Sequence, residues 1–380
     1  MTIRWGIIGC GDVCEVKSGP GFQQAEGSEL VAVMRRNGRL AQDFARRHGV
    51  SKWYDDVDVL INDGEVDAVY IATPPGSHVE LAQKVARAGK PCYIEKPMAR
   101  NAAECQAIID AFNARRVPLF VGYYRRALPR FVTVKDLIDT GEIGKVERVN
   151  YIHNEPTEEL DSSNLPWRLQ AEQSGGGLLL DVGCHAIDII DYLTGPMNWI
   201  RATAERRNAA YDVEDFVTFR WRTKEGVIGN AEWDFNADES KNLITIQGDD
   251  GEIAVSCFGD DPIVVTKDGE ETTFEAPNPT HIQQPLIQQI VNELSGRGKC
   301  ASTGESALRC SEVMDKALKH YYDGREDNFW ERPASWPGVD PQAKKLKPAQ
   351  QIPETPVKVE IPVEDDDRIE DGQIEEEAVQ

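Results

Sequence analysis

The chain has 380 residues, of which 40% are hydrophobic and 28% charged, proportions that suit a globular protein with a sizeable core. Its formal net charge of −23 argues against nucleic-acid and anionic-membrane partners, because their phosphates would be repelled. The eight cysteines include no Cys-x-x-Cys pair, so we expect reduced thiols in the cytoplasm rather than a disulfide framework or a metal site.

The first part of the chain alternates short apolar runs with amphipathic stretches. The first run begins at Ile3, which leaves no room for a signal peptide, and no apolar stretch approaches the roughly 18 residues of a membrane span. Five strands and three helices are predicted, the strands at Ile3–Ile8, Glu29–Met34, Val66–Ala72, Pro91–Ile94 and Val117–Tyr123, and the helices at Gly38–His48, Val79–Ala88 and Ala102–Phe112. Such alternation is typical of parallel βαβ units.

After about Arg126 the pattern changes to that of a second domain. A helix is expected near Arg130–Asp139, a strand at Val146–His153, and a helix at Asp181–Leu193 after a glycine triplet at 175–177. Six further strands and two final helices are predicted, the strands at Ile200–Glu205, Asp215–Trp221, Val227–Phe235, Leu243–Gly248, Glu252–Phe258 and Ile263–Thr266, and the helices near Ile282–Leu294 and Glu305–Tyr322. Tight turns between some of these strands indicate an antiparallel sheet.

Residues 339–380 form an acidic, Pro-rich tail. We expect this tail to be disordered, because it has too little apolar surface to offset its ordering entropy. Within it, Val357–Ile361 alternates like a strand between two prolines, so docking as an edge strand onto a sheet stays open as the alternative.

A candidate phosphate-binding loop, Gly9-Cys10-Gly11-Asp12-Val13-Cys14, follows the first strand and leads towards a helix. Gly9 permits a tight turn, and Gly11 lets the backbone approach a pyrophosphate at the positive end of that helix. The third fingerprint position carries Cys14 in place of Gly or Ala, which weakens the match. A plain strand–turn is the alternative, but the position of the loop favours a Rossmann dinucleotide site.

The end of the second strand reads Met34-Arg35-Arg36-Asn37, where NAD enzymes usually place an acidic residue for the ribose 2′-hydroxyl. Two guanidinium groups there suit a 2′-phosphate and stacking on adenine. NADP(H) is therefore favoured, with NAD(H) possible. The alternative is a solvated basic turn.

Two features suit hydride transfer. Glu95-Lys96-Pro97 stands at the carboxyl end of a parallel strand, where a lysine can hydrogen-bond a substrate hydroxyl; a surface lysine before a turn is the alternative. Asp181 and His185 lie four apart on one predicted helix face, so the carboxylate can orient the imidazole as a general base. The alternative is a capping Asp with a core histidine. A metal site using Cys184, His185 and Asp188 is disfavoured, because Cys184 falls on another face.

Several motifs together resemble the glucose–fructose oxidoreductase, inositol dehydrogenase and rhizopine-catabolism (Gfo/Idh/MocA) family over residues 1–338. They are the fingerprint at Gly9, Ala72-Thr73-Pro74-Pro75-Gly76-Ser77-His78, Glu95-Lys96-Pro97, Tyr123-Tyr124-Arg125-Arg126, Trp167-Arg168 and the block from Gly175 to His185. The resemblance implies an α/β fold: a Rossmann dinucleotide-binding domain over 1–125, then a substrate-binding and oligomerisation α/β domain over 126–338 with an open, mostly antiparallel sheet. It also implies a homo-oligomer through that sheet.

The resemblance also assigns residues to roles. It implies Lys96 as the catalytic lysine, with Asp181 and His185 matching the family's Asp-x-x-x-His pair. With the fingerprint and the two arginines, cofactor contacts are expected at Gly9, Gly11, Asp12, Val13, Arg35, Arg36, Thr73, Pro74, Pro75, His78, Glu95, Lys96, Trp167 and Arg168. Substrate contacts are expected at Tyr124, Arg125, Trp167, Asp181 and His185. No metal is expected.

The predicted function is hydride transfer between a nicotinamide dinucleotide and a sugar, polyol or keto-sugar. In the oxidation direction His185, oriented by Asp181, takes the hydroxyl proton while Lys96 steadies the developing alkoxide. Two alternatives stay open: a cofactor-binding sensor without catalysis, and a dihydrodiol- or imine-type reductase on the same fold.

Overall fold

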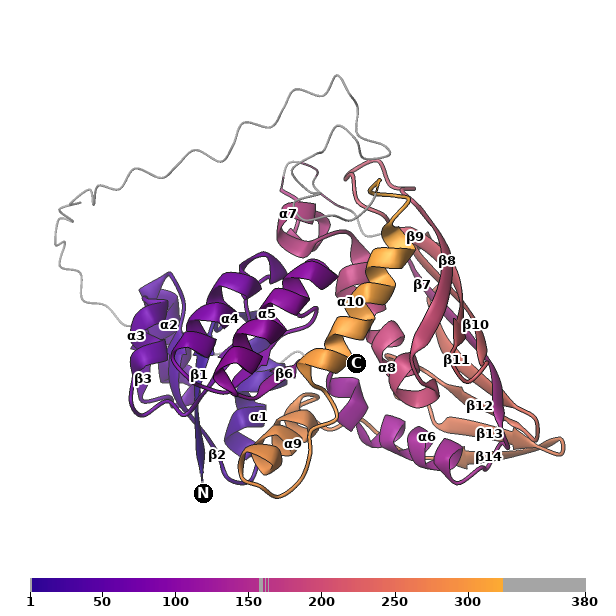
Figure 1. The fold of residues 1–380 in the computed structure, drawn as a ribbon, viewed down its shortest axis with the longest axis horizontal. Coiled ribbons are helices and arrows are strands. Elements are labelled where there is room, and N and C mark those ends of the chain that lie inside the picture. The colour runs from indigo at the N-terminus through magenta and orange to yellow at the C-terminus, as the bar shows by residue number, and fades with distance from the viewer. Residues whose placement is uncertain (1, 157–159, 161, 163, 324–380) are drawn as a thin grey trace, which may run out of the picture. The chain divides into compact units, whose positions relative to one another are not determined.

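The computed structural model describes residues 2–156, 160, 162 and 164–323, and its helices and strands are labelled in Figure 1. The N-terminal part is a parallel sheet in the order β3-β2-β1-β4-β5-β6. Its strands are β1 (Ile3–Ile8), β2 (Ser28–Met34), β3 (Lys52–Tyr54), β4 (Ala68–Ile71), β5 (Cys92–Ile94) and β6 (Leu119–Val121). This order reverses between β1 and β4, the switch point at which open α/β sheets bind ligands beyond their carboxyl ends. The predicted Rossmann-type sheet is confirmed.

Helices connect these strands in the way the βαβ pattern predicts. They are α1 (Gly19–Gln24), α2 (Gly38–His48), α3 (Val57–Asn62), α4 (His78–Arg87) and α5 (Ala102–Arg115). Side chains of Asn37, Asp56 and Asn101 accept hydrogen bonds from the first free backbone N–H groups of α2, α3 and α5, which fixes where those helices begin. The sequence analysis did not predict β3 or α3, because three and six residues are too few to show a hydrophobic period.

The second domain is a mixed, mostly antiparallel sheet in the order β14-β13-β12-β11-β7-β10-β9-β8. Its strands are β7 (Val146–Pro156), β8 (Met197–Glu205), β9 (Phe216–Thr223), β10 (Ile228–Ala237), β11 (Lys241–Gly248), β12 (Glu252–Val255), β13 (Ile263–Lys267) and β14 (Glu270–Phe274). Only β7 and β10 run parallel among the pairs described, and the other pairs confirm the predicted antiparallel arrangement. The sequence analysis missed β14, whose residues are almost all exposed and therefore show no alternation.

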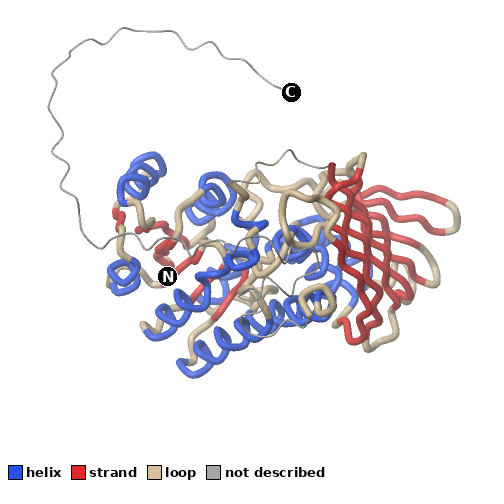
Figure 2. Tube along the Cα trace, turned by 90° about the horizontal axis from the view of Figure 1, so that it is seen from above, coloured by secondary structure: helices blue, strands red, loops and turns tan. Residues whose placement is uncertain are grey.

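Helices cover one side of this sheet, as Figure 2 shows. They include α6 (Pro129–Asp139), α7 (Ala171–Ser174) and α8 (Cys184–Thr194). Alternate side chains of β9 and β10, among them Trp221 and Trp233, are fully buried, and Gly183 at the start of α8 lies against Trp233. The inner face of the sheet therefore forms the core of the second domain.

The end of the described chain returns to the first domain. α9 (Gln284–Leu294) packs on α1, and α10 (Gly304–Leu318) packs on α5 as well as on α8 and β8. Just before α10, Thr303 forms a bridge with Phe120 of β6. Figure 1 shows α10 running between the N-terminal helices and the second sheet. The C-terminal helices therefore contact both domains, α10 by packing on α5 of the first domain and on α8 and β8 of the second.

Some sequence predictions concern chemistry or segments outside the fold itself. The tail at 339–380, with its possible strand Val357–Ile361, lies outside the described residues. All eight cysteines are buried, and each is a free thiol. Across the described part of the chain, no cluster of side chains suits a metal ion, and no helix there combines the length and the apolar character that a membrane crossing needs.

Candidate functional site

The loop after β1 has the shape of a phosphate cradle. Gly9 has a φ of +87°, and a Cβ added there would lie 2.6 Å from Thr73 Cγ2, so a larger residue would be strained and would clash. At Gly11 an added Cβ would meet only the Gly9 carbonyl oxygen, at an ordinary contact distance of 3.8 Å, so this position is not crowded. Cys14 is fully buried and burial raises its pKa, so it packs as a small neutral side chain.

The chain beyond this loop differs from a regular helix. Residues Cys14–Ser18 form a π-helical turn before α1 begins at Gly19. Gly19 is needed at that junction, because an added Cβ would lie 2.3 Å from the Cys14 carbonyl oxygen. The turn carries Lys17, an exposed residue that the sequence analysis did not select.

Two arginines stand at the end of β2. Arg35 is half-buried and Arg36 is exposed, and neither makes an ion pair with another described residue. Burial raises the pKa of the Cys10 thiol to about 11, while the Arg35 charge opposes this rise, so Arg35 lies close to the phosphate loop. The Arg35 guanidinium is therefore close enough to act electrostatically on the loop.

The loop after β4 carries the predicted residues Thr73, Pro74, Pro75 and His78. The Ser77 hydroxyl donates to Thr73 Oγ1 at 2.8 Å, and His78 is fully buried. The two ring nitrogens of His78 lie 2.7 Å from the Thr73 carbonyl oxygen and 3.1 Å from that of Met98. His78 therefore joins this loop to the turn after Lys96. Because both of its ring nitrogens face backbone carbonyl oxygens, the side chain positions Thr73 and leaves no ring nitrogen for a cofactor.

Glu95 is also occupied by protein groups. Its Oε1 accepts hydrogen bonds from Tyr70 Oη at 2.5 Å and Gln283 Nε2 at 2.6 Å, and its Oε2 accepts from the Lys96 N–H at 3.0 Å. Gln283 in turn accepts from Tyr93 Oη at 2.8 Å. This buried network holds the end of β5, and with it the start of the Lys96 turn, in one position.

Lys96 and Asp181 form the centre of the site. Lys96 Nζ donates to Asp181 Oδ1 at 2.7 Å and to the Asp181 carbonyl oxygen at 2.7 Å, and their side chains are 16% and 14% exposed. Burial lowers the pKa of Lys96, but the Asp181 charge outweighs it and raises that pKa above its ordinary value. Burial acts on Asp181 in the opposite sense and is likewise outweighed by Lys96, so the pKa of Asp181 is lowered. Both groups are held charged.

His185 lies on the first turn of α8, beside this pair. It is 5% exposed and packs against the rings of Tyr124 and Phe258, with centroids 5.1 and 6.0 Å away. Its Nδ1 has no hydrogen-bond partner in the described part of the chain. Burial lowers the pKa of His185 well below its ordinary value, and the charges of Arg125, Lys96 and Lys17 lower it further. The imidazole is therefore neutral near pH 7.

The proposed orientation of His185 by Asp181 needs correction. Asp181 hydrogen-bonds Lys96 instead, and no hydrogen bond between Asp181 and His185 is found among the described residues. Residues Leu179–Gly183 form a π-helical turn before α8 begins at Cys184, so Asp181 and His185 do not lie on one regular α-helix as predicted. The three predicted catalytic residues do come together, but the carboxylate orients the lysine.

The glycine triplet explains how the two domains meet at this point. Gly175 has a φ of +87°, and an added Cβ would lie 2.4 Å from the Arg100 carbonyl oxygen in the turn after Lys96. At Gly177 an added Cβ would lie 2.1 Å from the carbonyl oxygen of Glu214. Only glycine allows the backbone of this segment to pack so closely on both sides.

Trp167 and Arg168 lie in the single 3₁₀ turn Trp167–Leu169 just before α7. An added Cβ at Gly76 would lie 3.1 Å from the Glu172 carbonyl oxygen, so α7 touches the loop that carries Thr73. Arg168 is exposed, and its charge contributes to the lowered pKa of Asp181. This segment of the second domain therefore lies near the loop that carries Thr73 and near Asp181.

Sequence reasoning missed a polar group on the inner face of the second sheet. Asn242 of β11 donates through Nδ2 to Tyr151 Oη at 2.9 Å and lies 2.7 Å from His153 Nδ1, both on β7. Its Oδ1 accepts from the Cys257 N–H at 2.6 Å. The next residue, Phe258, packs on His185, so this group lines the same side of the site. The alternation of residues along β7 could have indicated that Tyr151 and His153 face the same side of the sheet. It could not have identified Asn242 of β11 as their partner.

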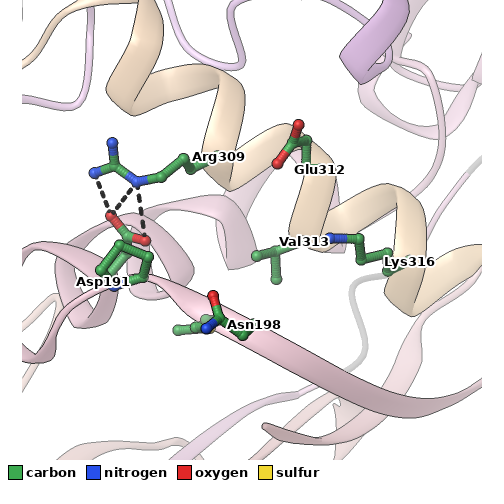
Figure 3. Close-up of a pocket in the computed structure, with 8 residues that line it drawn as sticks. Asp191, Asn198, Arg309, Glu312, Val313 and Lys316 are labelled. Atoms are coloured by element: carbon green, nitrogen blue, oxygen red, sulfur yellow. Dashed lines mark hydrogen bonds and ion pairs between the residues drawn. The ribbon is translucent and has the colours of Figure 1, made fainter. Parts of the chain in front are cut away.

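A separate cavity lies away from these residues. It is formed where α8 and β8 meet α10, and Figure 3 shows Arg309 reaching across it to Asp191. Arg309 Nη2 donates to Asp191 Oδ2 at 2.7 Å. None of the predicted site residues lines this cavity. The charged residues Arg309 and Asp191 in its lining pair with each other, so they form a structural contact between α10 and α8.

Two family models match the chain. The model described as "Oxidoreductase family, NAD-binding Rossmann fold" matches residues 3–123, and the one described as "GFO/IDH/MocA C-terminal domain" matches residues 131–254. The boundary between them falls after Tyr123, close to the predicted end of the first domain.

Known proteins share similarity along most of the chain. "Oxidoreductase P35" of Formosa agariphila is 38% identical over 317 residues, which cover 82% of this chain and 97% of that protein. "Inositol 2-dehydrogenase" of Rhizobium meliloti is 25% identical over 341 residues, covering 86% and 99%. A solved structure titled "Levoglucosan dehydrogenase, complex with NADH" superposes with a TM-score of 0.77 at 23% identity, covering 84% of this chain and 96% of that one. This last likeness shows the fold.

Proposed function

The chain belongs to the Gfo/Idh/MocA family of NAD-binding oxidoreductases, and we propose that it moves a hydride between NADP(H) and a hydroxyl-bearing carbon of a sugar, polyol or keto-sugar. The observation that carries this proposal is the contact of Lys96 with Asp181 beside His185. Relatives named for inositol, levoglucosan and 1,5-anhydrofructose support the substrate class.

The loops at the carboxyl ends of β1 and β4 fit a dinucleotide. The uncrowded position at Gly11 and the tight turn at Gly9 leave room for a pyrophosphate against the backbone. Bound nicotinamide supplies the carbon that accepts or returns the hydride. The residues of this chain bind and orient that group, and they handle the proton.

Lys96 provides a fixed positive charge for the reacting oxygen. Two hydrogen bonds to Asp181 hold its ammonium group, and one N–H remains for the substrate hydroxyl. In the oxidation direction this N–H stabilises negative charge as it develops on the oxygen. Asp181 keeps Lys96 protonated, which is the form that can donate.

His185 is the candidate proton acceptor for the hydroxyl. It is neutral near pH 7 because its pKa is lowered by burial and by nearby cations. Its buried Nδ1 has no hydrogen-bond partner in the described chain, so this ring nitrogen is not already engaged by a protein group. Acceptance of the hydroxyl proton in oxidation, and its return in reduction, contribute about 10²–10⁴ in rate.

The test combines cofactor titration with turnover. Wild type is titrated with NADPH and NADH by fluorescence and then assayed with aldoses, inositols and keto-sugars at the reduced nicotinamide band. Lys96→Met and His185→Gln are expected to lower kcat about 10²–10⁴-fold while cofactor binding persists. The matched control is Lys84→Met, which changes a lysine of α4 that pairs with Asp58 of α3. Wild-type turnover in both site variants would refute these roles.

The preference for NADP(H) is a separate proposal, supported by Arg35, whose charge acts on Cys10 of the phosphate loop, and by the exposed Arg36 that follows it. A charge-assisted hydrogen bond contributes about 1.5–3 kcal/mol, so Arg35→Ala should weaken NADP(H) about tenfold to a hundredfold and spare NAD(H). Equal weakening of both cofactors would show that Arg35 binds a part that they share.

We also propose a cytoplasmic homo-oligomer. The buried free thiols suit a reducing compartment. On the outer face of the second sheet, Trp199 is 54% exposed and Ile228 39% exposed, and both pair with Arg222 on neighbouring strands. This apolar patch supports the sheet as the assembly surface. Light scattering of Trp199→Asp is expected to show dissociation; an unchanged mass would remove this surface from the interface.

A further inference from the structure

Lys17 is an exposed cation that lies just beyond the phosphate loop at 9–14. Among the described residues, its ammonium group makes no ion pair. The acidic residue of the same turn, Glu15, is engaged elsewhere: its carboxylate accepts from Nη1 and Nη2 of Arg47 at 2.7 and 2.8 Å and lies 2.7 Å from His48 Nε2. The charge of Lys17 is therefore not paired within its own turn.

The backbone on both sides of Lys17 is held in place. Ser18 is fully buried, and its hydroxyl donates to the Val13 carbonyl oxygen at 3.3 Å. The Val16 carbonyl oxygen lies 2.8 Å from Nδ1 of His281, a residue that precedes α9. Contacts with α9 and with the phosphate loop thus fix the start of this side chain, while the side chain itself is exposed.

The turn that carries Lys17 and the turn Leu179–Gly183, which carries Asp181, are the two π-helical turns of the described chain. Such turns are rare and often stand at functional sites. Burial opposes the lowering of the pKa of Asp181, Lys96 outweighs it, and the Lys17 charge adds to the lowering. Burial also lowers the pKa of His185, and the Lys17 charge lowers it further. Lys17 therefore lies between the phosphate loop and the reaction site.

The phosphate loop has no cation of its own. Its one charged side chain, Asp12, is acidic and exposed, so the loop offers a diphosphate only backbone N–H groups and the positive end of the following turn. Arg35 acts on the loop from the end of β2, where the 2′-phosphate is proposed to bind. A lysine binds phosphate well as a point charge. Lys17 can supply the missing charge at the carboxyl end of β1.

We propose that the ammonium group of Lys17 binds the phosphate on the nicotinamide side of the dinucleotide. This phosphate joins the part of the cofactor at the loop to the part at the reaction site, and Lys17 acts electrostatically on the latter while it follows the former in sequence. NADP(H) and NAD(H) share this phosphate, so Lys17 serves both cofactors. The inference rests on the proposed function and adds a binding residue to the same site.

The test compares cofactor affinity in the full-length wild type and in Lys17→Met. Fluorescence titration is expected to show NADPH and NADH weakened by the same factor, about tenfold to a hundredfold, because a charge-assisted hydrogen bond is lost. Arg35→Ala, in contrast, is expected to weaken NADPH alone. Unchanged affinity for both cofactors in Lys17→Met refutes this inference only, whereas a wild type that binds neither cofactor refutes the proposed function as well.

Fragments of the cofactor identify the phosphate. ADP-ribose contains the phosphate on the nicotinamide side, and 5′-AMP lacks it, so each is titrated in competition with NADPH. In Lys17→Met, ADP-ribose is expected to lose affinity by the same factor as the whole cofactor, while 5′-AMP binds as it does to the wild type. An equal loss for 5′-AMP overturns the assignment to the nicotinamide side.

Further variants separate the charge from the turn. Lys17→Arg keeps the charge and should restore part of the affinity. Lys224→Met is the matched control, because Lys224 is likewise exposed and lies in the turn between β9 and β10. Without cofactor, Lys17→Met should melt at the wild-type temperature, since the side chain is exposed. A lowered melting temperature together with no rescue by Lys17→Arg would assign the loss to the turn and overturn the proposal.

Discussion

Replacing Asp181 with Asn tests whether this carboxylate serves the lysine or the histidine. The substitution keeps the shape of the side chain but removes the charge that lies 2.7 Å from Lys96 Nζ. A charge-assisted hydrogen bond contributes about 1.5–3 kcal/mol, and 1.36 kcal/mol corresponds to one pKa unit, so the pKa of Lys96 should fall by about one to two units. Burial, which already opposes the charged form in the wild type, is then no longer outweighed by the Asp181 charge.

The assay is the pH dependence of kcat/KM in the oxidation direction. In the wild type the raised pKa of Lys96 places the loss of the donating form beyond the usual alkaline range. In Asp181→Asn the pKa of Lys96 should fall from this raised value, so the alkaline decline in activity should begin at a lower pH than in the wild type. At its optimum, kcat/KM should fall about tenfold to a hundredfold, from the loss of fixed lysine geometry.

The controls separate this effect from a general disturbance. Asp67→Asn removes a carboxylate that pairs with Arg4 at 2.8 Å, outside the site, and should leave the profile as it is. If Asp181→Asn shifts the acidic side of the profile and leaves the alkaline side unchanged, then Asp181 tunes His185, and the Lys96 pairing is not the functional one.

Three further predictions follow from the same structure. Gly9→Ala should weaken cofactor binding at least tenfold in a fluorescence titration, because its Cβ would lie 2.6 Å from Thr73. Gly49→Ala is the control: Gly49 also has a positive φ, but an added Cβ meets no atom within 4 Å, so this change should cost only about 1 kcal/mol of stability. Asp188→Asn should lower the unfolding free energy by about 1.5–3 kcal/mol in denaturant titrations, since it removes the charge that accepts two hydrogen bonds from Arg126 and leaves the longer ion pair with Asp191 at 3.6 Å; an unchanged free energy would contradict this. Because the pKa of His185 is lowered, oxidation should persist below pH 6.5 and fall only as the ring gains its proton, and His185→Gln should remove that acidic limb.

The sequence predicted the placement of Lys96 because its position follows from a general rule. A residue just after a parallel strand lies at the carboxyl edge of the sheet, and β5 ends at Ile94 as the pattern of apolar residues indicates. The positive φ of Gly9 was equally accessible, since the fingerprint fixes which glycine makes the turn. Short-range rules of this kind do not depend on the second domain.

The partner of Asp181 was beyond the reach of the same reasoning. Spacing along a helix places Asp181 near His185, but the choice between an imidazole and an ammonium depends on Lys96, which is 85 residues away in sequence. The π-helical turn at Leu179–Gly183 is a further departure from the predicted helix, and no residue in it signals this in advance. The pairing of Asn242 with His153 depends on the register of β11 against β7 in the same way.

The geometry of the site rests on close backbone packing as much as on its charged groups. The backbone at Gly175 lies against Arg100, four residues after Lys96, and Asp181 lies six residues after Gly175. A side chain at Gly175 would push this segment away from the Lys96 turn, because the Arg100 carbonyl oxygen already lies within 2.4 Å of an added Cβ. Even about 1 Å of such movement would lengthen the contact between Lys96 Nζ and Asp181 beyond a normal hydrogen bond. We therefore expect substitutions in the glycine triplet to disturb the contact between Lys96 and Asp181, through the distance that the triplet sets between the two backbone segments.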